Sequence, residues 1–201
     1  MNERHVLVVG GGAAGLMAAG TAARAGAKVT ILEPNEKMGF KLRITGKGRC
    51  NVTNQVRALE DLIAAVPTNG KFLFRAFARF MPADTIAMFE SLGVPLAIER
   101  GQRVFPASNN AHDIADALDF FARKHKNFVG IRHDRATKLL VDGVRVVGVQ
   151  VSAGDLIAAD AVVLATGGCS YPKTGSTGDG YALASSVGHG IVPPRPSLVP
   201  L

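Results

Sequence analysis

A glycine-rich turn between an apolar run and an alanine-rich stretch constrains this chain more than any other feature. His5–Val9 is an apolar run typical of a parallel strand buried on both faces. Gly-Gly-Gly-Ala-Ala-Gly follows at 10–15, and then a helical stretch, 16–25, ends at Gly26. Lys28–Leu32 is a second β-type run. The order strand, turn, helix, strand predicts an α/β fold with a parallel sheet.

The turn has the spacing G-x-G-x-x-G, and each glycine has a physical role in binding a dinucleotide. Gly10 permits the tight turn, Gly12 lets the backbone approach a pyrophosphate, and Gly15 lets helix and strand pack closely. The first amides of the helix, those of Ala13 and Ala14 among them, then face the phosphate charge at the positive helix end. The pattern therefore predicts a dinucleotide site.

Glu33 closes the second predicted strand and supplies the acid that this motif uses. Its carboxylate can accept hydrogen bonds from a ribose, and its charge disfavours a 2′-phosphate at that position. The motif alone leaves NAD and FAD open as ligands.

A run of short β segments follows near the other end of the chain. Residues 138–141, 145–151 and 156–158 are separated by Asp-Gly and Gly-Asp turns, which predict an antiparallel meander at about 136–159. The apolar run 161–165 then predicts another parallel strand, and it ends in Thr166, Gly167 and Gly168. Because ligands gather at the carboxyl ends of parallel strands, we expect this second glycine turn beside the first.

Asp179 precedes a helical stretch at 181–187. Two interpretations of it stay open: a ribose or ribityl contact, or an acid that stabilises the helix N-terminus.

The middle of the chain predicts a helical insertion at about 55–127. Its candidate helices are 71–80, 83–92 and 111–124, the last with Asn109 or Asn110 as N-cap. Nine of the ten phenylalanines lie between positions 72 and 128, so this region has an aromatic core of its own. Residues 103–106 predict a strand that ends at a proline.

Composition narrows the class of protein further. No apolar run is long enough for a membrane span or a signal peptide, so a cytoplasmic location is expected. Two distant cysteines and five scattered histidines predict neither a disulfide nor a metal site. The net charge of +7 suits phosphate-bearing partners. Nucleic acid is not expected, because Trp is absent and basic and aromatic residues do not alternate on one element.

Four segments together carry a more specific signal. They are V-V-G-G-G-A-A-G-L at 8–16, T-G-K-G-R-C-N-V-T-N at 45–54, R-V-F-P-A-S at 103–108 and A-T-G-G-C-S-Y-P-K-T-G-S-T-G-D-G-Y at 165–181. In this combination the chain resembles the YhiN/BaiN-like family of bacterial flavoproteins, over essentially its whole length. The resemblance implies a Rossmann-like FAD-binding domain with a parallel sheet, a helical insertion and a small antiparallel meander.

The resemblance also implies that the segment 45–54 lies along FAD. Gly46 and Gly48 would allow close approach of the backbone, and hydrogen-bond donors would come from other side chains of this region: Lys41, Arg49, Asn51 and Thr53. Ala136, at the start of the meander, completes the expected cofactor contacts. The alternative is a glycine loop with a salt-bridged surface arginine. Cys50 and Cys169 are expected to serve packing.

The expected function is an FAD-dependent oxidoreductase that passes a hydride from NADH or NADPH, bound transiently, to an organic acceptor. A flavin-dependent enzyme that modifies transfer RNA, or a non-catalytic FAD-binding fragment, are the alternatives. The proline-rich residues 191–201 resemble the family's crossover from the FAD domain, 1–190, into a second domain. Neither the acceptor, a catalytic acid or base, nor the oligomeric state can be predicted from these residues.

Overall fold

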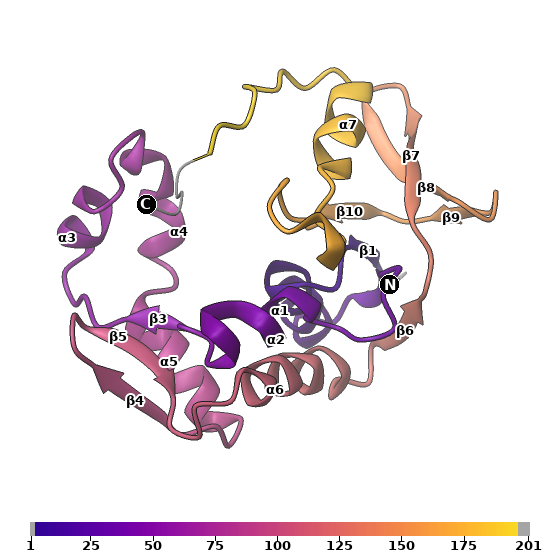
Figure 1. Cartoon of the computed structure of the whole chain (residues 1–201). Helices are drawn as coiled ribbons and strands as arrows, with labels where there is room; N and C mark the ends of the chain where they lie inside the picture. Colours follow the sequence, from indigo (N-terminus) through magenta and orange to yellow (C-terminus); the bar gives the residue numbers. More distant parts are fainter. Residues whose placement is uncertain (1–2, 197–201) are drawn as a thin grey trace. The chain divides into compact units, whose positions relative to one another are not determined.

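The computed structural model describes residues 3–196 of the chain (Figure 1). It divides into two compact units, one made of the residues up to Lys41 together with those from Leu118, and the other of Leu42–Ala117. The predicted crossover at 191–201 lies outside the described residues from position 197 onward, and residues 189–196 form neither helix nor strand. None of the helices within 3–196 combines the length and the apolar character that spanning a bilayer requires.

A four-stranded parallel sheet forms the centre of the first unit. Its order is β10 (Ala161–Leu164), β1 (His5–Val9), β2 (Lys28–Leu32) and β6 (Phe128–Arg132). The apolar runs at both chain ends therefore pair directly, with Val9 of β1 opposite Leu164 of β10. This arrangement confirms the predicted α/β class. The edge strand β6 had no clear signal in the sequence, because Gly130 interrupts its apolar run.

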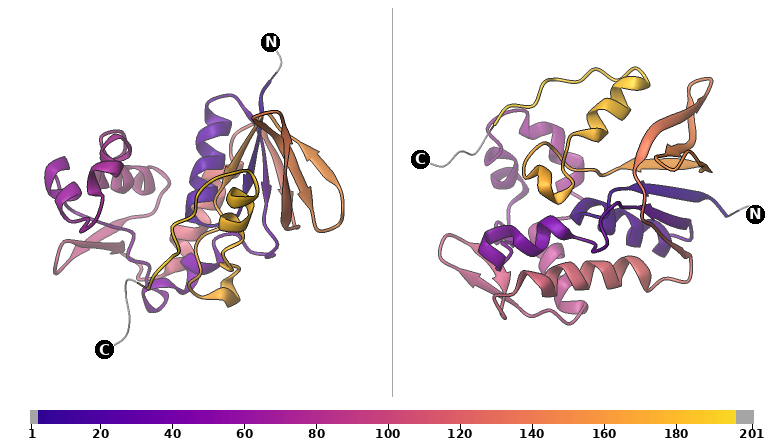
Figure 2. Two further views of the ribbon diagram at one scale, coloured as in Figure 1. Left: turned by 90° about the horizontal axis from the view of Figure 1, so that it is seen from above. Right: turned by 45° about the vertical axis from the view of Figure 1, so that its right-hand side comes forward.

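Helix α1 (Ala13–Arg24) and the meander cover opposite faces of this sheet (Figure 2). Side chains alternate accordingly: Val8 faces the start of α1 near Gly15, whereas Leu7 and Val9 belong to the cluster of buried residues formed with the meander. Burial on both faces explains why the strand is apolar from Val6 to Val9.

Gly20 sets how closely α1 packs against α6 (Ala111–Arg123). A Cβ at Gly20 would lie 2.4 Å from ring atoms of Phe121, so the ring occupies the space that a side chain would take.

The meander has the predicted topology. Its strands β7 (Ala136–Asp142), β8 (Arg145–Val151) and β9 (Leu156–Ala158) pair antiparallel in that order. Its apolar face packs with Leu183 of α7 (Asp179–Ser186), and these residues complete the core of the first unit.

The second unit combines helices with a small antiparallel sheet of order β3 (Thr53–Asn54), β5 (Arg103–Pro106) and β4 (Leu96–Glu99). Its other elements are α2 (Phe40–Ile44), which crosses the boundary between the units, η1 (Thr45–Gly48), α3 (Leu59–Ala64), η2 (Gly70–Leu73), α4 (Phe74–Phe77) and α5 (Pro82–Ser91). The single helix expected at 71–80 is two short ones, η2 and α4. Met81 is extended because it precedes Pro82, which begins α5.

Candidate cofactor-binding site

The glycine turn lies tightly against the end of β10. Gly10 has φ +107°, and its amide donates a hydrogen bond to the Leu32 carbonyl at 2.8 Å. A Cβ at Gly10 would lie 2.4 Å from the Ala165 carbonyl oxygen, and one at Gly15 would lie 1.8 Å from the Gly10 carbonyl oxygen. A Cβ at Gly12 would meet no atom within 4 Å. The turn is therefore closed against protein at Gly10 and Gly15 and open at Gly12.

The N-terminus of α1 is suited to an anion. Gly12 is its N-cap, no side chain caps the helix, and the first turn carries no acid. Ala13 and Ala14 are exposed. Amides at an uncapped helix start need an acceptor, and the oxygens of a pyrophosphate satisfy them and match the positive helix end. The donors that the chain presents here fit a dinucleotide.

Glu33 lies beside this turn and is 8% exposed. Its Oε2 accepts a hydrogen bond from the Gly11 amide at 2.7 Å. Its Oε1 accepts two from Asn35, at 2.9 Å from the backbone amide and at 2.6 Å from Nδ2. A carboxylate has about four acceptor sites, so Glu33 keeps capacity for a ribose hydroxyl.

The second glycine turn meets the first, because the Ala165 amide donates to the Val9 carbonyl at 2.8 Å. Thr166 Oγ1 accepts a hydrogen bond from the Gly180 amide at 3.0 Å, which links this turn to the start of α7. Gly167 has φ +78°, and a Cβ there would lie 2.8 Å from Ser176 Oγ. Gly168 continues the turn beside the Tyr181 hydroxyl. The two turns thus share one edge of the sheet.

Asp179 is the first residue of α7, and both of its carboxylate oxygens are engaged. Oδ2 accepts from Arg135 in an ion pair, and Oδ1 accepts from Thr177 Oγ1 at 2.7 Å. These contacts favour the helix-acid interpretation over a ribose contact. The side chain of Ala136, which follows Arg135, is buried in the meander core, so it is the backbone of this residue that could contact a ligand.

Lys41, in the first turn of α2, links this helix to the segment after β10. Its Nζ donates to the Ser170 carbonyl at 2.7 Å. The first unit therefore brings together the predicted residues of both glycine turns, Glu33 and Lys41. The turn η3 (Pro172–Thr174) follows Ser170 directly.

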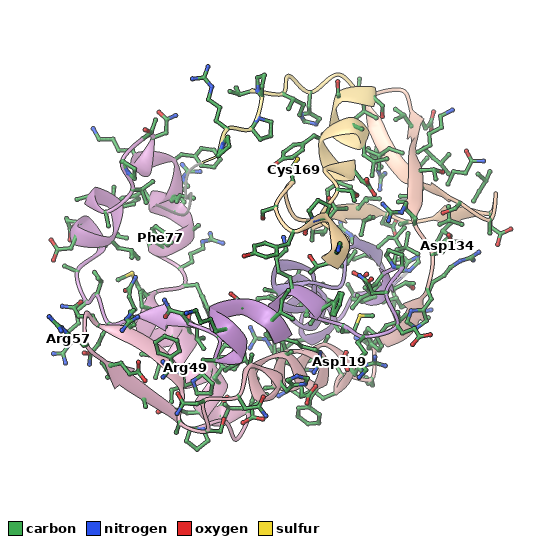
Figure 3. The ribbon with its side chains drawn as sticks, in the orientation of Figure 1. Arg49, Arg57, Phe77, Asp119, Asp134 and Cys169 are labelled. Carbon is green, nitrogen blue, oxygen red and sulfur yellow. The ribbon has the colours of Figure 1, made fainter. Side chains whose placement is uncertain are left out.

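The other predicted contacts lie in the second unit, where they organise the loop 45–54. The backbone is left-handed at Gly46, Lys47 and Cys50. Arg49 forms an ion pair with Glu99, donates from Nε to Asn109 Oδ1 at 2.8 Å, and stacks over the Phe105 ring at 4.3 Å (Figure 3). The loop is thereby tied to the β4–β5 hairpin, in agreement with the alternative of a salt-bridged arginine.

Three more of the predicted residues lie in the same loop and strand. Asn51 lies beside the carbonyl oxygens of Thr53 and Val104, and its amide nitrogen can donate to both, at 3.1 and 3.3 Å. Thr53 pairs with Val104 in the sheet. Gly48 has φ +83°, and a Cβ there would meet no atom within 4 Å. The side chains of Arg49 and Asn51 thus have partners within their own unit.

The two cysteines differ in environment. Cys50 is 2% exposed, and burial raises the pKa of its thiol to about 11. It is therefore protonated at neutral pH, whereas the nucleophile in thiol chemistry is the thiolate. Cys169 is exposed. Over residues 3–196, His, Cys, Asp and Glu side chains form no group of three or more that could hold a metal ion.

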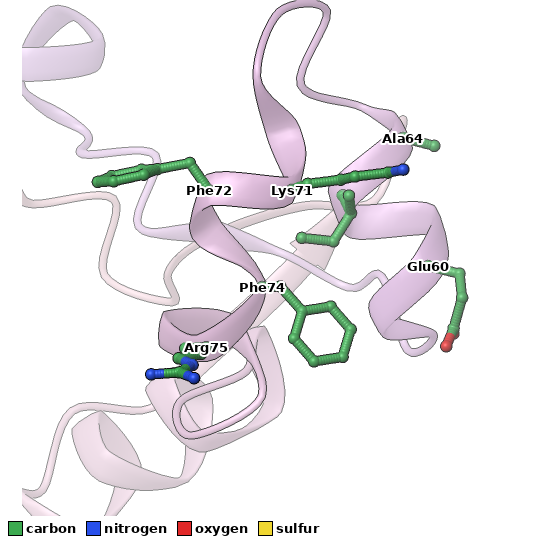
Figure 4. Close-up of a pocket in the computed structure, with 7 residues that line it drawn as sticks. Glu60, Ala64, Lys71, Phe72, Phe74 and Arg75 are labelled. Carbon is green, nitrogen blue, oxygen red and sulfur yellow. The ribbon is translucent and has the colours of Figure 1, made fainter.

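An open groove lies between α3 and the η2–α4 segment of the second unit (Figure 4). Its lining residues are Glu60, Ile63, Ala64, Lys71, Phe72, Phe74 and Arg75. Phe72 is 87% exposed and Phe74 is 51% exposed. The whole segment 71–80 carries three cations and four phenylalanines and no acid. Basic and aromatic residues therefore alternate along this segment, which the structure divides between η2, α4 and the residues that follow.

Asn35 is the main residue at this site that the sequence did not reveal. It lies in the segment between β2 and α2, and its only sequence signal is its place two residues after the acid of the motif. Gly11 is a second residue of this kind. A Cβ there would lie 2.5 Å from Met38 Sδ and 3.0 Å from Glu33 Cγ.

Comparison with known proteins gives clear matches. The profile of the HI0933-like protein Rossmann domain matches residues 4–195. The chain is 37% identical to the 3-dehydro-bile acid delta(4,6)-reductase of Clostridium scindens, covering 96% of this chain and 46% of that protein. It is 31% identical to the ribosomal RNA dihydrouridine synthase of Haemophilus influenzae, covering 96% and 48%. The chain thus spans about half the length of these curated relatives.

Solved structures share the fold at lower identity. Sdh1 of Mycobacterium smegmatis matches with a TM-score of 0.64 and 20% identity over 94% of this chain and 39% of that one. Thermovibrio ammonificans THI4 matches with a TM-score of 0.56 and 19% identity over 82% and 58%. At these identities the likeness concerns the fold alone.

Proposed function

Since the chain belongs to the HI0933-like protein family, through its Rossmann domain, we propose that it binds FAD and is the cofactor-holding part of an oxidoreductase. One observation carries the proposal: the open glycine turn at Gly12, the uncapped start of α1 and the buried carboxylate of Glu33 lie at one edge of the parallel sheet. An extended ligand with a pyrophosphate and a ribose matches that set of groups.

Different residues of the first unit would contact different parts of this ligand. The amides of Ala13 and Ala14 would face the pyrophosphate, and Gly12 would leave room for it. Glu33 would accept a hydrogen bond from the adenosine ribose, and its charge disfavours a 2′-phosphate. The turn at Thr166 and Gly167, beside Gly10, would contact the same ligand. When bound, FAD supplies hydride transfer.

We assign the donor to NADH or NADPH and the acceptor to an unsaturated organic compound. The relatives support the choice of acceptor, because one is named a reductase and the other a dihydrouridine synthase, and both names describe reductions. Steady-state assays with NADH and with NADPH would identify the electron donor and the acceptor.

The test is the absorption spectrum of the purified protein, followed by acid release and identification of the chromophore. We expect bands near about 370 and 450 nm and release of FAD. A protein that stays colourless and does not bind added FAD, although it is folded by circular dichroism, would contradict the proposal.

The segment 71–80 favours a second candidate, the reduction of a pyrimidine base in RNA. Exposed rings such as Phe72 and Phe74 can stack on unpaired bases, and Lys71 and Arg75 can contact phosphates. The relative from Haemophilus influenzae is named for action on ribosomal RNA, which supports this candidate.

Fluorescence anisotropy with a labelled single-stranded RNA tests the second candidate. We expect Phe72→Ala to weaken binding at least about fivefold, since base stacking contributes ~1–3 kcal/mol. Phe120→Ala, at an exposed phenylalanine of the first unit, is the matched control and should bind as the unaltered chain does. Equal weakening by both variants, or no salt-dependent binding, would exclude this role for the groove.

A further inference from the structure

Asn35 makes more contacts at the candidate site than its place in a connecting segment suggests. Its backbone amide and its Nδ2 both donate to Glu33 Oε1, at 2.9 and 2.6 Å. The same Nδ2 lies 3.4 Å from the Thr174 carbonyl oxygen, and the Asn35 carbonyl accepts from His133 Nδ1 at 3.0 Å. One residue thus links the acid after β2 with η3 and with the segment before β7.

These contacts fix the carboxylate of Glu33 in one orientation. Gly11 holds Oε2 from the side of the glycine turn, and Asn35 holds Oε1 from the opposite side. One donor on Oε2 and two on Oε1 hold the carboxylate, and of these the Asn35 Nδ2 is the side-chain donor, itself fixed by the Thr174 carbonyl. The acceptor capacity that remains then points in a defined direction.

We propose that Asn35 is a positioning residue that orients the Glu33 carboxylate toward the ribose 2′-hydroxyl of the bound dinucleotide. The inference rests on the proposed function. It goes further because it assigns ribose selectivity to a pair of residues, Glu33 and Asn35, whose second member lies outside the glycine motif.

Packing around Asn35 makes the pair sensitive to substitution. A Cβ at Gly175 would lie 3.0 Å from Asn35 Nδ2, so the turn closes directly over the amide. Thr174 is buried beside it. Asn35→Ala removes the Nδ2 donor and its link to Thr174, and leaves Glu33 Oε1 with the backbone amide of residue 35 alone, so the carboxylate is held less firmly.

A ligand comparison separates positioning from general support of the fold. Dissociation constants for ADP and for 2′-deoxy-ADP are measured by calorimetry on the unaltered chain and on Asn35→Ala. We expect the unaltered chain to prefer ADP by about tenfold, because the hydroxyl donates to a charged acceptor. In Asn35→Ala this preference should fall to about twofold or less, while 2′-deoxy-ADP binds with nearly unchanged affinity.

The matched control is Asn127→Ala, which removes another half-buried asparagine of the first unit. Its Nδ2 donates to the Ala23 carbonyl at 3.5 Å, away from Glu33. This variant should keep the full preference for ADP.

The outcomes distinguish the role of Asn35 from the existence of the dinucleotide site. If Asn35→Ala keeps the preference, or weakens both nucleotides equally, Asn35 is not the positioning residue, although the dinucleotide site stands. If the unaltered chain binds neither nucleotide, the proposed function fails, and this inference fails with it.

Discussion

Single glycines in the first turn have different tasks, although the motif lists them together. Gly15 packs against the Gly10 carbonyl, so its lack of a side chain serves the fold. Gly12 faces open space, so its lack of a side chain serves no contact within the described protein. A substitution at Gly15 therefore tests folding, whereas a substitution at Gly12 tests ligand binding.

We predict opposite results for alanine at these two positions. Gly15→Ala forces the turn apart and should lower the melting temperature, whereas Gly12→Ala should melt like the unaltered chain. Gly12→Ala should nevertheless bind FAD at least about tenfold more weakly, because the methyl group occupies the approach to the pyrophosphate. Thermal unfolding and titration with FAD check both results, and strong FAD binding by Gly12→Ala would contradict the assignment of this site.

The cysteines give a second prediction at this scale. At pH 7 to 8 a maleimide should label Cys169 alone, because Cys50 is buried and protonated. Mass spectrometry of the labelled chain measures this, and Cys169→Ser should abolish labelling in the folded state.

The raised pKa of Cys50 also determines in which direction the stability of the folded state changes with pH. Because burial raises the pKa of the thiol in the folded state above the ordinary value of a cysteine, the folded state favours the protonated thiol. This contribution is complete below about pH 9 and is lost as the pH rises toward 11. A loss of stability in that window that persists in Cys50→Ala would have another cause.

Among the helices, α1 and α6 depend on one close contact. The ring of Phe121 fills the space above Gly20, so Gly20→Ala requires the helices to separate. We expect a loss of about 1–3 kcal/mol in the free energy of unfolding, as overpacking commonly causes. Urea titration measures it.

Two further variants test whether packing against Phe121 causes this loss of stability. Gly20→Ala combined with Phe121→Leu should recover part of the loss, since the smaller side chain leaves room. Gly190→Ala, at a glycine whose Cβ would meet no atom within 4 Å, should change stability by a few tenths of a kcal/mol. Similar losses from Gly190→Ala and Gly20→Ala would argue against packing as the cause.

The conformation of the loop 45–54 depends on the contacts of Arg49. Arg49→Lys keeps the charge but loses the planar group that stacks on Phe105 and reaches Asn109. We expect faster amide hydrogen exchange in 45–54 and 96–106, with the meander unchanged. Uniformly faster exchange over the whole chain would instead indicate global destabilisation.

At the scale of the molecule, the sequence predicted the elements with local patterns well. The parallel strands β1, β2 and β10, the meander and helix α6 all follow from apolar periodicity and turn residues. The small sheet of the second unit was predicted only at β5, because β3 and β4 are too short to show alternation. The contacts of Asn35 and Arg49 could not be predicted, since each joins residues that are distant in sequence or hidden in an irregular segment.

The strand order of the parallel sheet also has a consequence for biosynthesis. β1 pairs with β10, and the Gly10 turn is closed by Ala165, so the binding edge contains residues made about 150 positions apart. While the ribosome works through the intervening insertion, Leu7 and Val9 have no meander to cover them. A nascent chain therefore exposes these apolar residues until the meander and α7 have been synthesised, and the sheet edge that carries both glycine turns can form only after that point.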